Sequence, residues 1–477
     1  MSEAPKNSES PAASSGPPRV ELVQGLGSWA AASIVVGTMI GTGIFLVPSS
    51  MAANAGSVGL VFLAWILGGI LSLAGALTYA ELGAAIPEAG GDYAYLNRGL
   101  GPRWGYLFGW MHSIVGRPCS VATIAAGFMR LCGFLRPTIA QTVVTYPIWI
   151  PFSHAPYNFH VTPAQPLAVG AIAAVTFINY LGVRLGGRIQ VVLTTLKVLA
   201  VTAVILLAVT VGRGGTANFK PLLPDVWGPG LWSGVLAAMV AAAWAYDGWS
   251  NINLVGSEVI RPQRNIPLAL LGGVAGVMVI YLLANVAYFW ALPFSAVAGS
   301  QHIASDVIAT FAGQRAAAWL TVAMLVSALG TLNSSILSGA RVPYAMGRDG
   351  LFFHFTGVVD QKFRTPGGAL VFQAYLASIL ALSGTYEDLF SLFIFAQWIF
   401  YALVVASVYG LRRREPDLPR PYRTWGYPWV PAIFIAGAIA LTVGLWAARP
   451  VRSTVGLALI LLGLAFYRSW QRSTRPT

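Results

Sequence analysis

Residues 37–45 read Gly-Thr-Met-Ile-Gly-Thr-Gly-Ile-Phe, inside an apolar run from about Trp29 to Val47 that is long enough to cross a bilayer. A glycine in a helix interior costs about 1 kcal/mol relative to alanine, so three glycines in seven residues predict an interrupted helix. Non-helical backbone at membrane depth is tolerated only where protein or a water-filled site satisfies its polar groups. The N-terminus of the second half-helix would then attract an anion such as a carboxylate.

The same glycines have a second interpretation, which is helix packing. Gly37 and Gly41 form a G-x-x-x-G pair, and taken alone such a pair favours close helix packing by roughly two to one. Residues 244–253, Trp-Ala-Tyr-Asp-Gly-Trp-Ser-Asn-Ile-Asn, reverse that preference, because they place a matching interruption in a later apolar run. A nucleotide-binding loop is excluded, because the glycines lack the G-x-G-x-x-G order.

The composition indicates an integral membrane protein. Of the 477 residues, 56% are hydrophobic and only 9% are charged, which is too apolar for a soluble chain of this length. Apolar runs of about 20 residues predict twelve membrane spans. Their approximate bounds are 28–53, 58–86, 104–131, 164–182, 189–211, 231–257, 267–292, 317–340, 367–384, 388–410, 428–447 and 453–467.

The two interruptions also predict the arrangement of the spans. Secondary transporters are often built from inverted repeats with a broken helix at matching positions, and here the interrupted runs are the first and the sixth. We therefore expect an all-α membrane protein with a five-plus-five inverted repeat, broken helices 1 and 6, and two additional C-terminal helices. The predicted units are a disordered tail at 1–20, a transmembrane domain at 21–470 (repeats at about 28–211 and 231–410, extra helices at about 428–467) and a tail at 471–477.

The distribution of basic residues predicts the orientation in the membrane. Twenty of the 29 lysines and arginines lie in segments on the side of the N-terminus, seven lie in or beside segments on the other side, and Arg117 and Lys197 fall inside spans. This is the positive-inside pattern. It predicts a plasma membrane protein with both termini cytoplasmic, and it explains the net charge of +13 without nucleic acid.

Four charged residues need partners. Lys197, midway along the fifth span, costs about 2.5 to 3.5 kcal/mol at that depth; unwound carbonyls of the first span are its expected partners, and snorkelling towards the cytoplasmic surface is the alternative. Arg117, in the third span, is predicted to be structural. Glu81 and Glu258, near cytoplasmic span ends, are predicted to belong to gating or structural ion pairs.

Asp247 is the most informative acidic residue, because it lies in the second interruption. It could bind a cationic side chain of a substrate or cap the following half-helix, and the residues alone leave these two roles even. Trp244 and Tyr246 flank the interruption, where one could cover a ligand; core packing is the alternative. Histidine and cysteine show no metal-ligating spacing and no nucleophile–base arrangement is present, so we predict no metal, no cofactor and no enzymatic activity.

Eight motifs in order along the chain resemble the L-type amino acid transporter family of the amino acid, polyamine and organocation superfamily, and we expect a prokaryotic member. They lie at residues 37–45, 79–96, 117–118, 244–249, 264–267, 285–288, 338–350 and 411–421. The resemblance implies a LeuT-like fold that moves free L-amino acids without sodium, typically by one-for-one exchange through alternating access.

The resemblance also implies roles for individual residues. The substrate carboxylate would meet the backbone amides of Gly41, Thr42 and Gly43. The substrate ammonium group would meet backbone carbonyls at Met39, Ile40, Trp244 and Ala245. Trp244 matches the position of the aromatic gate in the family. Lys197 matches a lysine that stands in for a sodium ion, and the Tyr281 hydroxyl is the implied relay partner.

Specificity and partners are less constrained by the resemblance. Ser250 replaces the asparagine that the family often carries after the sixth-span tryptophan, whereas Asp247 is similar to members that accept cationic as well as neutral amino acids. Proton-coupled uptake of cationic amino acids or polyamines, with Asp247 or Glu258 titrating, is the alternative function. In animal members a partner glycoprotein attaches through a cysteine after the third span; Cys132 is near but not clearly equivalent, and we predict no such heavy chain. The oligomeric state stays open.

Overall fold

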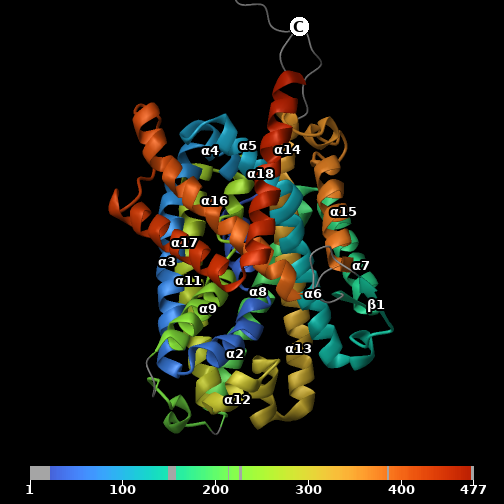
Figure 1. Ribbon diagram of the computed structural model, residues 1–477, viewed down its shortest axis with the longest axis vertical. Helices are drawn as coiled ribbons and strands as arrows, with labels where there is room; N and C mark the ends of the chain where they lie inside the picture. Colours follow the sequence, from blue (N-terminus) through green and yellow to red (C-terminus); the bar gives the residue numbers. More distant parts are fainter. Residues whose placement is uncertain (1–21, 149–156, 213, 225–227, 384–385, 474–477) are drawn as a thin grey trace, which may run out of the picture.

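In the computed structural model, the chain forms a bundle of long helices (Figure 1). The structure describes residues 22–148, 157–212, 214–224, 228–383 and 386–473. The predicted N-terminal tail at 1–20 and the last four residues of the predicted C-terminal tail lie outside the described residues. The helices are α1 (Ser28–Met39), α2 (Gly43–Ala55), α3 (Val58–Ala85), α4 (Asp92–Gly99), α5 (Pro102–Met111), α6 (Arg117–Leu135), α7 (Ala164–Tyr180), α8 (Val183–Thr210), α9 (Pro229–Ala245), α10 (Asn251–Leu254), α11 (Pro262–Ala291), α12 (Phe294–Gly299), α13 (Ile303–Gly339), α14 (Arg341–Arg348), α15 (Gly367–Ser383), α16 (Tyr386–Arg414), α17 (Trp429–Ala448) and α18 (Pro450–Ser473).

The length and apolar composition of the helices agree with the predicted class of membrane protein. Among the described residues, nine helical segments are long and apolar enough to cross a membrane. Three shorter apolar helices, Ala164–Tyr180, Gly230–Ala245 and Gly367–Ser383, fall where further spans were predicted. One element was not predicted: β1 (Val144–Ile148) and β2 (Tyr157–Val161) form an antiparallel pair in which Val144 faces Val161.

The two ends of the bundle differ. Helices α4 and α14 and the last turns of α18 lie at one end, which we call the terminal end, and α12 lies at the opposite end, which we call the far end (Figure 1). The segment before α1 also lies at the terminal end, because Leu26 forms a parallel bridge with Val259 and the neighbouring Glu258 contacts Arg341 at the start of α14.

Helix α1 lies deep in the bundle, against α8, α11 and α13. Gly37 is buried at the contact with α8, where a Cβ atom would come within 2.2 Å of both Gln190 Nε2 and Thr194 Oγ1. Those two side chains donate hydrogen bonds to the Ser33 carbonyl, at 3.2 and 3.1 Å. Gly37 therefore serves close helix packing, and the helix is interrupted at the residues that follow it.

Candidate functional site

The first helix is interrupted where the sequence predicts it. Helix α1 ends at Met39 and α2 begins at Gly43, so residues 40–42 are not helical. The Gly41 amide turns back to the Met39 carbonyl at 2.8 Å. In the part of the chain that the structure describes, the amides of Thr42, Gly43 and Ile44 have no hydrogen-bond acceptor. Three N–H groups at the start of a 13-residue helix therefore remain available to an anion.

Carbonyl groups released by the same interruption are bound by Lys197. Its Nζ atom, on α8, donates to the carbonyls of Gly37 and Ile40, each at 2.7 Å, and to Thr331 Oγ1 on α13 at 3.1 Å. The side chain is 1% exposed, so it does not snorkel. Thr331 Oγ1 also lies 3.2 Å from the Gly37 carbonyl. One buried ammonium group thus joins α1, α8 and α13 at the break.

The second interruption lies beside the first. Helix α9 ends at Ala245 and a short helix resumes at Asn251. Gly248, between them, has φ +102°, a conformation that side chains rarely adopt, and a Cβ atom there would lie 2.4 Å from Thr38 Cγ2. The Tyr281 hydroxyl spans the two breaks, 2.5 Å from the Met39 carbonyl and 2.9 Å from the Ala245 carbonyl.

A small central pocket lies between the two interruptions, with a volume of about 30 Å³. Seven of the predicted binding residues line it, namely Met39, Gly41, Thr42, Gly43, Trp244, Ala245 and Asp247. Three do not: Ile40 directs its carbonyl to Lys197, Tyr246 packs on Trp65 and Tyr281, and the Ser250 hydroxyl contacts that of Tyr401 at 3.1 Å. The volume suits a few water molecules, so a larger ligand requires the pocket to widen.

Asp247 belongs to a buried polar cluster. Its Oδ1 atom accepts a hydrogen bond from the Tyr401 hydroxyl at 2.8 Å. Arg117 does not reach it as an ion pair; instead, the guanidinium donates to Asn251 Oδ1 at 2.8 Å and to His112 at 3.4 Å. Arg117 is 6% exposed, and its structural role stays a prediction.

Asp92, at the start of α4, is a second acid near this cluster. The Tyr79 hydroxyl donates to it at 3.1 Å. Burial raises the pKa of the Asp92 carboxyl to about 7, while the Tyr79 hydrogen bond and the Arg117 charge act in the opposite direction. Among the described residues, no group of three His, Cys, Asp or Glu side chains is placed to hold a metal ion.

The two remaining predicted acids form ion pairs at the terminal end. Glu258 binds Arg341 through two hydrogen bonds, at 2.7 and 2.9 Å, and both side chains are at most 1% exposed. The Glu258 carbonyl also accepts the amides of Gly25 and Leu26, each at 3.0 Å. Glu81 binds Arg412 on α16 at 3.0 and 2.7 Å. The Glu258 contacts thus connect the segment before α1 with α14, and the Glu81 contacts connect the end of α3 with α16.

Several lining residues carried no signal in the sequence. Ser120, Thr331 and Ser335 line the central pocket, yet each is a small hydroxyl residue of a kind that is common in membrane helices. Tyr401, which binds Asp247, lies among many other aromatic residues. Contacts over such separations in the chain depend on the tertiary fold, so no local pattern predicts them.

Comparison with known proteins identifies relatives over nearly the whole chain. The family described as "Amino acid permease" matches residues 26–466. The chain is 32% identical over 444 residues to b(0,+)-type amino acid transporter 1 of Mus musculus, covering 91% of this chain and 85% of that protein. It is 30% identical over 462 residues to the Homo sapiens protein of the same name, covering 94% and 88%. It is also 30% identical over 473 residues to Large neutral amino acids transporter small subunit 2 of Homo sapiens, covering 96% and 82%.

Proposed function

Because the chain belongs to the amino acid permease family, we propose that it is a sodium-independent exchanger of L-amino acids that works by alternating access. Its relatives are amino acid transporters rather than enzymes, which supports amino acid transport as its activity. In this proposal the membrane is the plasma membrane, the terminal end is cytoplasmic, and the twelve spans form the five-plus-five inverted repeat with two further helices. No heavy-chain glycoprotein is required.

The unpaired amides at the start of α2 carry the proposal for substrate binding. Thr42, Gly43 and Ile44 present three N–H groups at the positive end of a helix, which suits the α-carboxylate that all amino acids share. Gly41 is not a free donor, because its amide is bound to the Met39 carbonyl. The substrate ammonium group would meet carbonyl oxygens at Trp244 and Ala245 across the pocket.

Trp244 is the proposed gate. Its Cζ3 atom would lie 3.2 Å from a Cβ atom built on Gly43, so the indole covers the start of α2. The central pocket of about 30 Å³ is too small for an amino acid side chain while the indole holds this position. We therefore assign substrate entry to a rotation of Trp244, and substrate exchange to alternate opening of the two ends.

Lys197 supports sodium independence. A sodium ion in a broken-helix transporter is held by unwound carbonyls, and here the Lys197 ammonium binds two such carbonyls and the Thr331 hydroxyl. The side chain therefore occupies the position where a cation would bind. Tyr281 extends the network by binding carbonyls of both interruptions.

The experiment that tests this proposal is efflux of a labelled amino acid from proteoliposomes. We expect labelled leucine to leave only when an amino acid is supplied outside, at the same rate in sodium and in choline buffer. Efflux into empty buffer would contradict obligatory exchange. Uptake driven by an acidic outside would favour the proton-coupled alternative, with Asp247 as the titrating group, because Glu258 is engaged by Arg341.

A further inference from the structure

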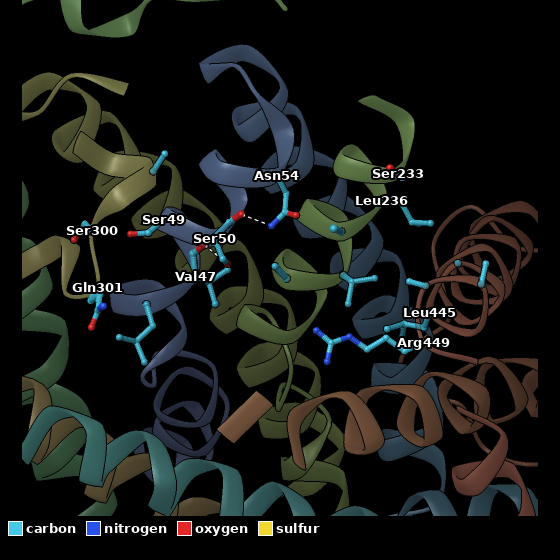
Figure 2. Close-up of a pocket in the computed structure, with 18 of the residues that line it drawn as sticks. Val47, Ser49, Ser50, Asn54, Ser233, Leu236, Ser300, Gln301, Leu445 and Arg449 are labelled. Carbon is cyan, nitrogen blue, oxygen red and sulfur yellow. Dashed lines mark hydrogen bonds between the residues drawn. The ribbon is translucent and has the colours of Figure 1, made fainter. Parts of the chain in front are cut away.

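A second and larger cavity lies at the far end of the bundle, with a volume of about 570 Å³ (Figure 2). Its walls come from α2, from α9, from the end of α17, and from Ala298, Ser300 and Gln301 at and just after the end of α12. This volume lies within the range of small-molecule sites, whereas the central pocket does not. The cavity therefore has room for a solute of amino acid size.

The cavity is lined by two arginines that have no ion-pair or hydrogen-bond partner among the described residues. Arg449 directly follows α17 and its side chain extends among the other lining residues in Figure 2. Arg130, on α6, lines the same cavity. Neither guanidinium forms an ion pair or hydrogen bond with any residue that the structure describes, and no aspartate or glutamate lies among the described lining residues. Asp306 is not a lining residue, but it accepts a hydrogen bond from the lining residue Ser300.

The neutral polar residues of the cavity present acceptors. The Ser50 hydroxyl donates to the Val47 carbonyl at 2.9 Å, and the Ser233 hydroxyl donates to the Gly230 carbonyl at 2.8 Å. The Asn54 side-chain amide donates to the Ser50 carbonyl at 2.6 Å. The two hydroxyl protons and one of the two Asn54 amide protons are thus used within their own helices, and the three side-chain oxygens remain available as acceptors to an ammonium group. Guanidinium groups, acceptor oxygens and the apolar side chains of Leu236 and Val240 together match a zwitterion with an apolar side chain.

The cavity lies directly beyond the central pocket along two helices. Val47 lines the cavity and Gly43, four residues earlier on α2, lines the central pocket. On α9, Val240 lines the cavity and Trp244, four residues later, lines the central pocket. Four helical residues correspond to about 6 Å. A solute that leaves the cavity inwards therefore next meets Trp244 and the free amides of α2.

We propose that this far-end cavity is a second amino acid site, at which Arg449 and Arg130 bind the α-carboxylate of an incoming amino acid before it passes Trp244. The proposal rests on amino acid transport as the function. Arginine binds carboxylates with two parallel hydrogen bonds, but both side chains are exposed, and exposed ion pairs are weak. The site thus binds the substrate and releases it readily. A lipid phosphate shares the same anionic chemistry, so the test must separate the two sources.

The test is the concentration dependence of leucine exchange in phosphatidylcholine vesicles. We expect Arg449→Gln and Arg130→Gln each to raise the KM for external leucine about three- to tenfold with the maximal rate changed less than about twofold, because capture and not the central site is affected. Arg449→Lys keeps the positive charge, so its KM for external leucine should stay close to that of wild type. Arg136→Gln, an exposed arginine at the end of α6 outside the cavity lining, is the matched control and should behave as wild type.

Equilibrium binding of labelled leucine to the purified protein gives an independent result. Wild type should bind two molecules per chain and the Arg130→Gln/Arg449→Gln double variant one. A wild-type stoichiometry of one, or unchanged KM values in variants that transport normally, would overturn the second site and leave the exchanger intact. Absence of amino acid transport in wild type would instead refute the proposed function. An arginine effect that appears only when phosphatidylglycerol is added would assign the cavity to lipid and overturn the amino acid assignment.

Discussion

Lys197 is the residue on which the first interruption depends most. We expect Lys197→Met to reduce leucine exchange at least tenfold and to lower the Tm, because it removes the ammonium donor from two buried carbonyls and leaves them only the longer contacts with the Thr331 and Ser327 hydroxyls. Each lost charged hydrogen bond costs about 1 to 3 kcal/mol. Exchange and thermal unfolding of the purified protein measure both effects. Leu199→Met, on the membrane-facing side of the same helix, is the control and should change neither. Exchange by Lys197→Met at the wild-type rate would contradict the assigned role.

Asp247 separates the two interpretations that the sequence left even. If its charge binds cationic side chains, Asp247→Asn lowers arginine and lysine exchange about tenfold, equivalent to about 1.4 kcal/mol, and leaves leucine exchange unchanged. Tyr401→Phe is the matched control, since it removes the hydrogen bond to Asp247 and keeps the charge. Competition of each amino acid against labelled leucine measures the difference. An equal loss for all substrates would indicate that Asp247 only caps the following half-helix.

At this scale, the sequence predicted residues whose chemistry is unusual for their surroundings. A lysine, an aspartate and three glycines stand out in apolar spans because each has a known energetic cost there. It did not predict Thr331 or Tyr401, since a hydroxyl or an aromatic residue is ordinary in such a helix. It also placed Ser250 at the pocket, whereas that hydroxyl contacts Tyr401 outside the lining.

At the scale of elements, the second interruption requires glycine at one position. We expect Gly248→Ala to destabilise the protein by about 1 to 3 kcal/mol, because alanine is strained at φ +102° and its Cβ atom would overlap Thr38. Gly272→Ala is the control: it lies within α11 with no atom near the new methyl group, and helix propensity favours the alanine. Thermal unfolding compares the two. Equal Tm values would mean that α9 and α10 do not need the observed turn.

The ion pair between Glu258 and α14 gives a second prediction for the elements. Glu258→Gln removes one charge of a pair that is almost fully buried, so we expect a loss of about 3 to 5 kcal/mol and a looser terminal end. Glu88→Gln is the matched control. It removes an acid from the exposed Arg98 contact, where we expect about 0 to 1 kcal/mol. Thermal unfolding and protease cleavage near residue 25 report stability and opening; equal values for the two variants would contradict this account.

Whole helices were easier to predict than their contacts. Long apolar runs indicated most helix positions, because a bilayer requires about 20 apolar residues in each span. The small β1–β2 pair was missed, since it lies in a connection between two predicted spans, where the length requirement of the bilayer does not act. The Arg341 partner of Glu258 was also missed, because it follows 83 residues later and no local pattern links the two.

For the whole molecule, our proposal makes the far-end cavity and the central pocket two stages of one route, while a buried ion pair joins elements at the terminal end. The sequence predicted the interruptions and the class of transporter, and the orientation in the membrane stays a prediction. It did not predict the far-end cavity, since Arg130 and Arg449 lie 319 positions apart and meet only in the folded bundle.

The most direct test of the central claim is a cryo-electron microscopy structure of the protein in nanodiscs with saturating leucine. We expect the leucine carboxylate within hydrogen-bond distance of the Thr42, Gly43 and Ile44 amides, its ammonium group at the Trp244 and Ala245 carbonyls, and a widened central pocket. Leucine bound elsewhere while those three amides face only water would contradict the proposed substrate site.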